Sequence, residues 1–262
     1  MLSDEEIGFF REKGYLRVPG VFTDAETKEL SDALDELVQT WAFEAAWTGP
    51  WREVLMDPEM SKRSRLTALH DLQLFSSAWA RAVAHPRLVE VVGDLLGPLV
   101  ELHHSTLHIK PPESGQPFPL HQDHPFYRHL DDRFVAVLVH LDDTCHENGE
   151  IRFLEGSHRQ GPLQHITQTS SGPCTPFLPT DDYHIEDTVA VPAKAGDVVC
   201  MSINSIHGSY INSTPQARRL VRVGYRDPRN IQVDGQAAGT LGLMVRGERP
   251  KVKPPTDLYV AG

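Results

Sequence analysis

Four short motifs place a histidine two positions before a carboxylate, and such a pair can bind a metal ion. The three considered as candidates are His121-Gln122-Asp123, His140-Leu141-Asp142 and His184-Ile185-Glu186. On a β-strand, residues two positions apart point to the same side, so both side chains of a motif can reach one ion. With a second histidine they form the three-ligand face of non-haem iron(II) oxygenases, which leaves coordination positions open. The chain has 14 histidines and 36 acidic residues, so chance produces some of these motifs and their context has to select among them.

The context favours the first motif. His121-Gln122-Asp123 follows a loop rich in Pro and Gly, and it is flanked by Leu120 and Phe126-Tyr127, which can wall an apolar pocket. The motif at His140 ends a predicted strand, and a strand-to-turn role explains it. The motif at His184 lies in an acidic segment typical of a surface loop. We therefore take His121 and Asp123 as candidate metal ligands.

A third candidate ligand, His207, is followed by Gly208 and Ser209, and a polar loop then leads to Arg218 and Arg219 at the start of a predicted strand. Strands joined by such a loop are usually neighbours, so His207 and one arginine should face the same cavity. There the guanidinium can bind a carboxylate through two hydrogen bonds, and the Ser209 hydroxyl can donate another. Alternation groups Arg219 with the apolar residues of its strand and so points it toward the core. The residues alone leave the choice between the two arginines open.

The elements that have to position these residues are helices first and strands later. Ser3 with Glu6 and Thr23 with Glu26 form capping boxes, which predict two helix starts. An apolar stripe predicts a third helix over 86–96. From about residue 99 the predicted strands are 100–110, 133–141, 151–154, 188–191, 197–203 and 219–225. This order is typical of an antiparallel sandwich or barrel with helices laid on one sheet.

We expect one domain over 1–262, with a helical part over about 1–98, a β core over about 99–230 and a tail over about 231–262. The acidic start lacks the features of a signal peptide. The longest apolar run, from Phe134 to Val139, is too short to span a membrane. The three cysteines form no CxxC pair, and we interpret them as buried free thiols in a reducing cytoplasm. They are Cys145, Cys174 and Cys200.

The formal net charge of −11 disfavours nucleic acid as a partner, because phosphate binding needs clusters of Lys and Arg that the chain lacks. We therefore expect a small-molecule partner, with no nucleic acid and no membrane, and the oligomeric state stays open. The four tryptophans are interpreted mainly as packing residues, although they lie where substrate-facing elements could be. They are Trp41, Trp47, Trp51 and Trp79.

The chain from Lys110 to Tyr225 resembles the phytanoyl-CoA dioxygenase family, which includes ectoine hydroxylase. The resemblance rests on a series of motifs in the family's order, followed by Arg218. These motifs are Lys110-Pro111-Pro112, His121-Gln122-Asp123, Asn148-Gly149-Glu150, Gly156-Ser157-His158, Ala195-Gly196-Asp197 and His207-Gly208-Ser209. In the first 99 residues, the likeness is mainly confined to the opening segment.

The resemblance implies a mainly β fold with flanking helices on a double-stranded β-helix (jelly-roll, cupin-like) core. It implies iron(II), O2 and the co-substrate 2-oxoglutarate, with His121, Asp123 and His207 as iron ligands. The family's 2-oxoglutarate arginine follows the second histidine by eleven positions, which selects Arg218. By the same likeness, Ser209 helps to hold the distal carboxylate. His104, on the strand before the Pro/Gly loop, is a candidate for lining the cofactor pocket.

The expected function is that of a dioxygenase that hydroxylates or otherwise oxidises an unactivated C–H bond of a small metabolite, releasing succinate and CO2. Related halogenases replace the motif carboxylate with a small residue, so the presence of Asp123 favours hydroxylation. Two alternatives stay open. One is a jelly-roll hydrolase whose metal activates water without a co-substrate. The other is a metabolite-binding protein that keeps the fold without catalysis.

Overall fold

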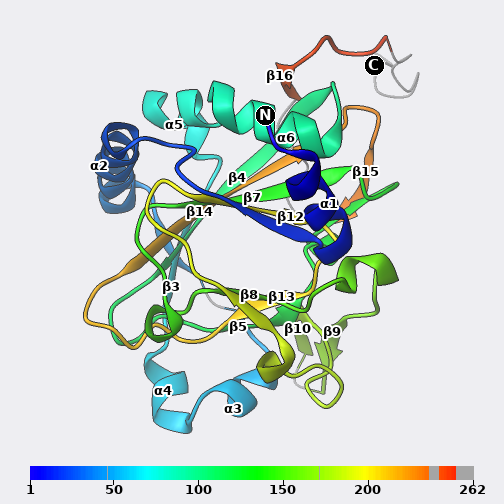
Figure 1. Cartoon of the computed structure of the whole chain (residues 1–262). Helices are drawn as coiled ribbons and strands as arrows, with labels where there is room; N and C mark the ends of the chain where they lie inside the picture. The colour runs from blue at the N-terminus through cyan, green and yellow to red at the C-terminus, as the bar shows by residue number, and fades with distance from the viewer. Residues whose placement is uncertain (46, 171, 236–241, 252–262) are drawn as a thin grey trace, which may run out of the picture.

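The structure is a computed structural model that describes residues 1–45, 47–170, 172–235 and 242–251. Within these residues, two antiparallel sheets face each other across the body of the molecule (Figure 1). The larger has the order β1 (Tyr15–Val18), β12 (Val198–Ser202), β7 (Phe134–His140), β14 (Arg218–Arg226), β4 (Val100–Lys110), β3 (Leu66–His70) and β2 (Phe43–Ala45), and β16 (Leu243–Arg246) also pairs with β4. The smaller has the order β11 (Val189–Val191), β8 (Ile151–Phe153), β13 (His207–Ser209) and β5 (Phe118–His121). The predicted jelly-roll core is confirmed.

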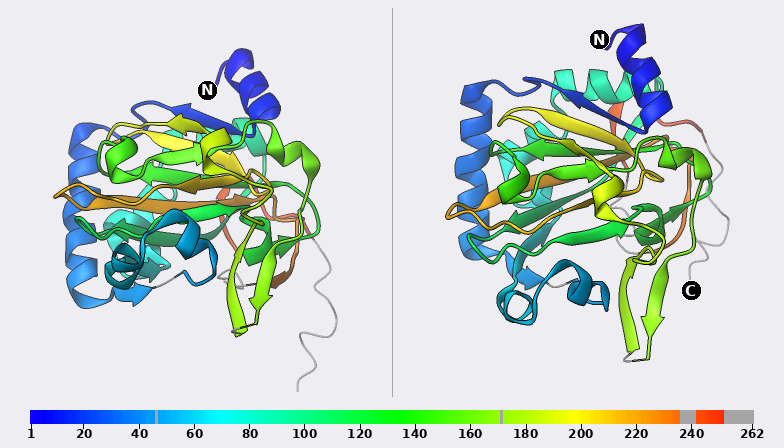
Figure 2. Two further views of the ribbon diagram at one scale, coloured as in Figure 1. Left: turned by 90° about the horizontal axis from the view of Figure 1, so that it is seen from below. Right: turned by 60° about the horizontal axis from the view of Figure 1, so that its bottom comes forward.

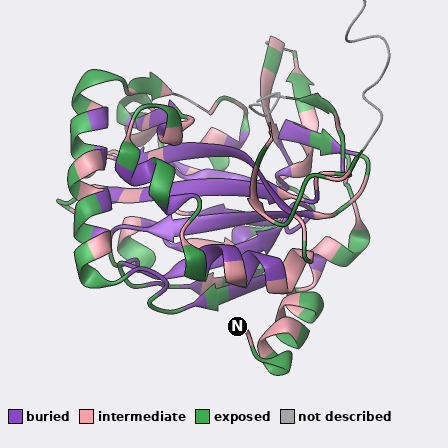
Figure 3. Cartoon of the chain, turned by 90° about the horizontal axis from the view of Figure 1, so that it is seen from above, coloured by how far each residue is buried: buried purple, intermediate pink, exposed green. Residues whose placement is uncertain are grey.

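Helices cover the outer face of the larger sheet, as predicted (Figure 1). They are α2 (Asp24–Thr40), α5 (Ser77–Ala82) and α6 (Pro86–Leu96). The capping box at Thr23 begins α2, and Leu34 of that helix is fully buried in the core against the sheet. The first predicted helix is α1 (Asp4–Lys13), which begins at the Ser3 capping box and ends at Gly14 in the left-handed region. Figure 3 shows that buried residues concentrate on the strands and exposed residues on the outer sides of the helices.

The remaining elements lie around the smaller sheet. The short helices α3 (Trp51–Leu55) and α4 (Pro58–Arg63) lie beside it (Figure 1). The hairpin of β9 (Ile166–Thr169) and β10 (Gly172–Phe177) projects from the body (Figure 2). Trp51 is fully buried against Phe177 of this hairpin, and Trp79 is fully buried beneath the helices. The packing interpretation therefore holds for these two tryptophans, whereas Trp41 is exposed.

Strand β14 is buried on both faces. Val221 and Tyr225 belong to the core cluster beneath the helices. Leu220 belongs to a second cluster between the two sheets, and alternation gives Arg218 and Arg222 the same side as Leu220. The inner face of this strand therefore carries both apolar and cationic side chains.

Strands also occur outside the predicted β core. The segment predicted to be a tail supplies β16 and also β15 (Gln232–Gly235), which pairs with β6 (Tyr127–His129); residues 252–262 of it lie outside the described residues. The part predicted to be helical supplies β1, which pairs with β12 in the larger sheet. These short strands gain their stability from distant partners, so local sequence does not reveal them.

No helix among the described residues is long and apolar enough to cross a membrane. All three cysteines are free, as predicted, but they are not all buried. Cys200 is buried in the larger sheet, Cys174 is half-buried and Cys145 is exposed. Cys145 departs from the prediction because it lies in the connection after β7 rather than in a strand.

Candidate active site

Strand pairing brings the two candidate histidine ligands together. His207 at the start of β13 lies opposite His121 at the end of β5, and their ring centroids are 4.2 Å apart. Each ring donates Nδ1–H to the carbonyl two residues earlier, His121 to Pro119 (2.7 Å) and His207 to Ser205 (3.0 Å). Burial lowers the pKa of both imidazoles. Both are therefore neutral, and each leaves Nε2 free to bind a metal.

Asp123 completes a group of three ligands. One ligand atom from each of His121, Asp123 and His207 lies within 4.8 Å of the others, and all three residues are buried. Arg222 donates from Nη1 to Asp123 Oδ1 (2.6 Å), whereas Asp123 Oδ2 is buried without a hydrogen-bond partner. A buried carboxylate oxygen needs a partner. A divalent cation between this oxygen and the two imidazoles would supply it, so the donor set fits iron(II).

Gln122 fixes the turn between the two ligands of the motif. Its side chain points the other way and is fully buried. Nε2 donates to the carbonyls of Gly161 (2.9 Å) and Asn204 (2.7 Å), and Oε1 accepts from the amide of Leu163 (2.8 Å). These three bonds tie the motif to two neighbouring loops, so His121 and Asp123 are held in place from behind.

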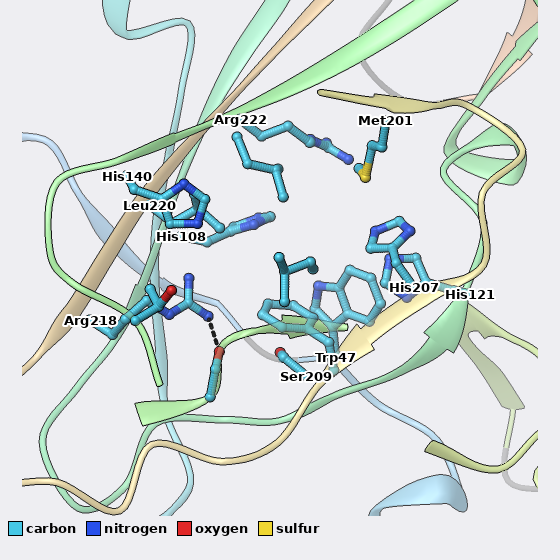
Figure 4. A pocket seen from close by; sticks show the side chains of 15 residues that line it. Trp47, His108, His121, His140, Met201, His207, Ser209, Arg218, Leu220 and Arg222 are labelled. Carbon is cyan, nitrogen blue, oxygen red and sulfur yellow. Dashed lines mark hydrogen bonds between the residues drawn. The ribbon is translucent and has the colours of Figure 1, made fainter. Parts of the chain in front are cut away.

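A cationic pocket lies at the other end of the same cavity (Figure 4). Arg218 is buried and donates only a 3.3 Å hydrogen bond to the Gly149 carbonyl, which leaves Nε and Nη1 without partners. Burial lowers the pKa of Arg218 to about 10, so it is still a cation at neutral pH. The Ser209 hydroxyl accepts from Lys110 Nζ (2.7 Å). A buried guanidinium with two unpaired donors beside a hydroxyl fits a carboxylate.

The structure places the two arginines on opposite faces of β14. Arg219 is half-buried on the helix side and forms ion pairs with Asp142 (2.7 Å) and Asp35 (3.1 Å). Alternation therefore assigned Arg219 to the apolar face correctly, but that face packs beneath the helices and the cavity lies on the other. Only Arg218 of the two lines the cavity.

The other two motifs behave as their contexts indicated. Asp142 of the second motif pairs with Arg219 at the end of β7, while His140 is buried and lines the cavity beside Arg218. The third motif lies on an exposed loop, where only its central Ile185 is buried.

Two cavities meet at the three ligands. The first, of about 40 Å³, is lined by His121, His207, Ser209 and Arg218. The second, of about 190 Å³, is lined by Asp123 together with apolar and polar side chains from β2, β3 and β4. Three residues line both cavities, namely Trp47, His108 and Arg222. A metal ion held by the three ligands would be reachable from either side.

The prediction for His104 is not supported by its position. The residue is buried on β4 behind Arg222, with His104 Nε2 3.3 Å from Arg222 Nη2, and it lines neither of the two cavities. His108, four residues further along the same face of β4, lines both. The strand was identified correctly, but the cavity lies nearer its later end.

Sequence reasoning missed Arg222 and the role of Trp47. Trp47 packs against His121, with ring centroids 4.6 Å apart, and so walls the site as well as packing. Arg222 shares the inward alternation of Arg218, and that pattern was the available signal. Burial lowers the pKa of Arg222, but its contacts with Asp123 and Tyr127 outweigh burial and raise it.

Comparison with known proteins agrees with this geometry. The profile of the phytanoyl-CoA dioxygenase (PhyH) family matches residues 10–220. A probable alpha-ketoglutarate-dependent hypophosphite dioxygenase of Stutzerimonas stutzeri is 25% identical over 219 residues, which cover 82% of this chain and 76% of the relative. An ectoine dioxygenase of Bordetella parapertussis is 26% identical over 246 residues, which cover 87% of this chain and 77% of the relative.

Solved structures show the same fold. EctD from S. alaskensis, solved with 2-oxoglutarate and 5-hydroxyectoine, superposes with a TM-score of 0.72 at 22% identity and covers 96% of this chain and 87% of its own. The alpha-ketoglutarate-dependent carbocyclase SnoK gives a TM-score of 0.73 at 21% identity, covering 89% of this chain and 87% of its own. The predicted fold and the predicted class of 2-oxoglutarate-dependent oxygenase are confirmed. The chain belongs to the phytanoyl-CoA dioxygenase family.

Proposed function

We propose that this enzyme hydroxylates a C–H bond of a small metabolite in a reaction that needs iron(II), 2-oxoglutarate and O2. One observation carries the proposal. Two neutral imidazoles and a carboxylate with an unpartnered oxygen converge in the same cavity as a buried arginine that has two unpaired donors. The hydrolase alternative explains the metal ligands but gives Arg218 no anion to bind.

In this proposal His121, Asp123 and His207 hold the iron, while Arg218 and Ser209 hold the distal carboxylate of 2-oxoglutarate. Bound iron and co-substrate supply the activation of O2, with succinate and CO2 as co-products. The chain supplies the geometry. The carbonyls of Pro119 and Ser205 fix the two imidazoles through Nδ1, which directs both Nε2 atoms to one point.

The walls of the site keep water away from the reacting groups. Trp47 packs edge-on against His121 and Phe118, and its ring also contacts the tilted ring of Phe126. Excluding water strengthens the electrostatic contacts of Arg218 and prevents side reactions of the activated site.

The second cavity is the proposed substrate site, because it meets the ligands on the side away from Arg218. The relatives are named for small molecules such as hypophosphite, ectoine and L-proline, which supports a small metabolite as substrate. We also place the enzyme in the cytoplasm, and three free cysteines support that placement.

The test is to incubate the purified protein with iron(II), 2-oxoglutarate, O2 and a set of candidate metabolites. The proposal expects the gain of one oxygen atom in one metabolite together with an equal amount of succinate. Asp123→Ala should abolish both. Turnover that continues without O2 and 2-oxoglutarate would instead support the hydrolase.

A further inference from the structure

Arg222 is a buried cation at the junction of the two cavities. Its Nη1 donates to Asp123 Oδ1 at 2.6 Å, and its Nη2 contacts the Tyr127 hydroxyl and lies 3.3 Å from His104 Nε2. The guanidinium also lies over the Tyr127 ring, with Cζ 4.9 Å from the centroid. Its side chain is only 9% exposed. These contacts hold the guanidinium in a fixed orientation.

The contacts of Arg222 do not use all of its donors. A guanidinium has five N–H groups, and Nε of Arg222 is buried without a partner. Arg222 lines both cavities, so a molecule bound in the larger cavity is within reach of its remaining donors. Buried donors without partners are rare in proteins, and a ligand that accepts from them explains the exception.

The charges around the cavities do not balance. Among the described residues that line them, Arg218 and Arg222 are cations and Asp123 is the only carboxylate. The two charges of iron(II) and the two of 2-oxoglutarate cancel. Among these lining side chains the cations therefore outnumber the carboxylates by one, and an anionic group on a ligand would balance the difference.

We propose that the substrate carries a compact anionic group, such as a carboxylate or a phosphonate, and that Arg222 recognises this group in the larger cavity. The inference rests on the proposed function, because it assumes that 2-oxoglutarate occupies the cavity at Arg218. The rest of the larger cavity suits a small body with mixed polarity. Its walls include the apolar Leu66 and Phe126 and the polar Thr106 and Thr175.

The experiment uses matched pairs of probes that differ in charge. Cyclopentanecarboxylate with cyclopentanecarboxamide and methylphosphonate with dimethyl methylphosphonate are two such pairs, and further carboxylates without an amine extend the set together with their amides. The protein is loaded with Zn(II), which does not support oxidation, and with saturating 2-oxoglutarate, and binding is measured by calorimetry. We expect at least one anion to bind about tenfold or more tightly than its neutral partner, because a charge-assisted hydrogen bond is lost in the neutral compound.

Substitutions then assign this preference to one residue. Arg222→Gln should abolish the preference, and Arg222→Lys should keep it but weaken binding, because the charge stays and the planar fork is lost. Arg219→Gln is the matched control on the same strand and should leave the preference unchanged, since Arg219 pairs with Asp142 outside the cavity. If Arg222→Gln does not fold, the Arg222→Lys result decides.

The outcomes separate this inference from the proposed function. If the wild-type protein does not bind the metal, or does not bind 2-oxoglutarate, the proposed function fails. If it binds them but every anion binds no more tightly than its neutral partner, the inference about the substrate is overturned and the function stands. A preference that survives in Arg222→Gln, or an affinity unchanged in Arg222→Lys, also overturns it and leaves Arg222 as a positioning residue for Asp123.

Discussion

The two carboxylate oxygens of Asp123 have different roles. One carboxylate oxygen accepts from the buried Arg222, and the other is left for a metal. The ion pair fixes the carboxylate before any metal binds, so the residue serves both the site and the stability of the protein without metal. Removing one member of a fully buried pair leaves the other charge uncompensated.

This double role predicts two separate losses in Asp123→Ala. Iron affinity and activity should be abolished, and the free energy of unfolding of the metal-free protein should fall by about 3–5 kcal/mol because Arg222 stays buried and unpaired. Asp142→Ala is the control, since it removes a partner of the half-buried Arg219 and should cost no more than about 1 kcal/mol. Denaturant unfolding measures the free energy of unfolding, and iron titration measures the affinity for iron. Equal stability losses in the two variants would contradict the buried-pair argument.

Substitutions of the two neighbouring arginines should affect the KM for 2-oxoglutarate differently. Arg218→Lys keeps the charge but loses the planar fork, so the KM for 2-oxoglutarate should rise about 10- to 100-fold, the equivalent of one or two strong hydrogen bonds. Arg219→Lys should leave this KM unchanged, because Arg219 faces the helices. Steady-state assays with varied 2-oxoglutarate measure the difference. If the KM for 2-oxoglutarate rises only in Arg219→Lys, the anion binds on the side of β14 that faces the helices, and the assignment to Arg218 is wrong.

Site residues could be predicted from the sequence where a motif occurred at the spacing that is typical of the family. The motif at His121, together with His207 and Arg218, could be selected because family spacing added to residue chemistry. Arg222 was not selected although it shares the alternation of Arg218, because alternation alone does not say which face of a strand buried on both sides meets the cavity. His104 was chosen in place of His108 for a different reason, because alternation does not say how far along the strand the cavity lies.

Among the elements, most strands of the core were predictable, including the short β8 and β11, but the strands that carry the two histidine ligands were not. The predicted strands over 100–110 and 219–225 match β4 and β14 closely. In contrast β5 and β13, which carry both histidine ligands, have four and three residues. Their pairing joins segments far apart in the chain, so their stability comes from tertiary contacts rather than from local propensity.

The turn at Gly149 makes a prediction at the scale of an element. It closes the loop that leads to β8, has a φ of +75°, and accepts the hydrogen bond from Arg218. A Cβ there would lie 2.4 Å from the Tyr210 carbonyl oxygen. Gly149→Ala should therefore destabilise the protein by more than the roughly 1 kcal/mol of left-handed strain alone, and it should raise the KM for 2-oxoglutarate by displacing Arg218.

Gly20→Ala is the matched control for that variant. Gly20 also has a positive φ, of +57°, but nothing lies within 4 Å of its added Cβ. This variant should show the strain of about 1 kcal/mol and an unchanged KM. Thermal or denaturant unfolding and the steady-state assay compare the two. If the two variants have similar stability losses and a similar KM for 2-oxoglutarate, the added Cβ at Gly149 is accommodated by small shifts of its neighbours, and the prediction is wrong.

Across the whole molecule, the helices and the sheets form one body. The core beneath the helices contains residues of α2, α6, β4, β7 and β14, and the second core lies between the two sheets. The part of the domain predicted to be helical also supplies strands to the larger sheet. Composition located the change from helix to strand, but it could not show that β1 and β3 return to the later sheet.

Buried neutral histidines spread through this body predict how its stability depends on pH. Burial lowers the pKa of His103, His129 and His140 to about 4, whereas in the unfolded chain each titrates near about 6.5. Between these values the unfolded state binds more protons than the folded state, so stability is full above about pH 6.5 and falls as the pH drops toward about 4. Each histidine contributes at most about 1.4 kcal/mol per pH unit to the slope.

Urea unfolding of the metal-free protein between pH 7.5 and 4.5 measures this dependence of stability on pH. His140→Gln should reduce the slope by one histidine's share because the glutamine does not titrate. A slope that is unchanged in His140→Gln would show that His140 is protonated in the folded state as readily as in the unfolded chain.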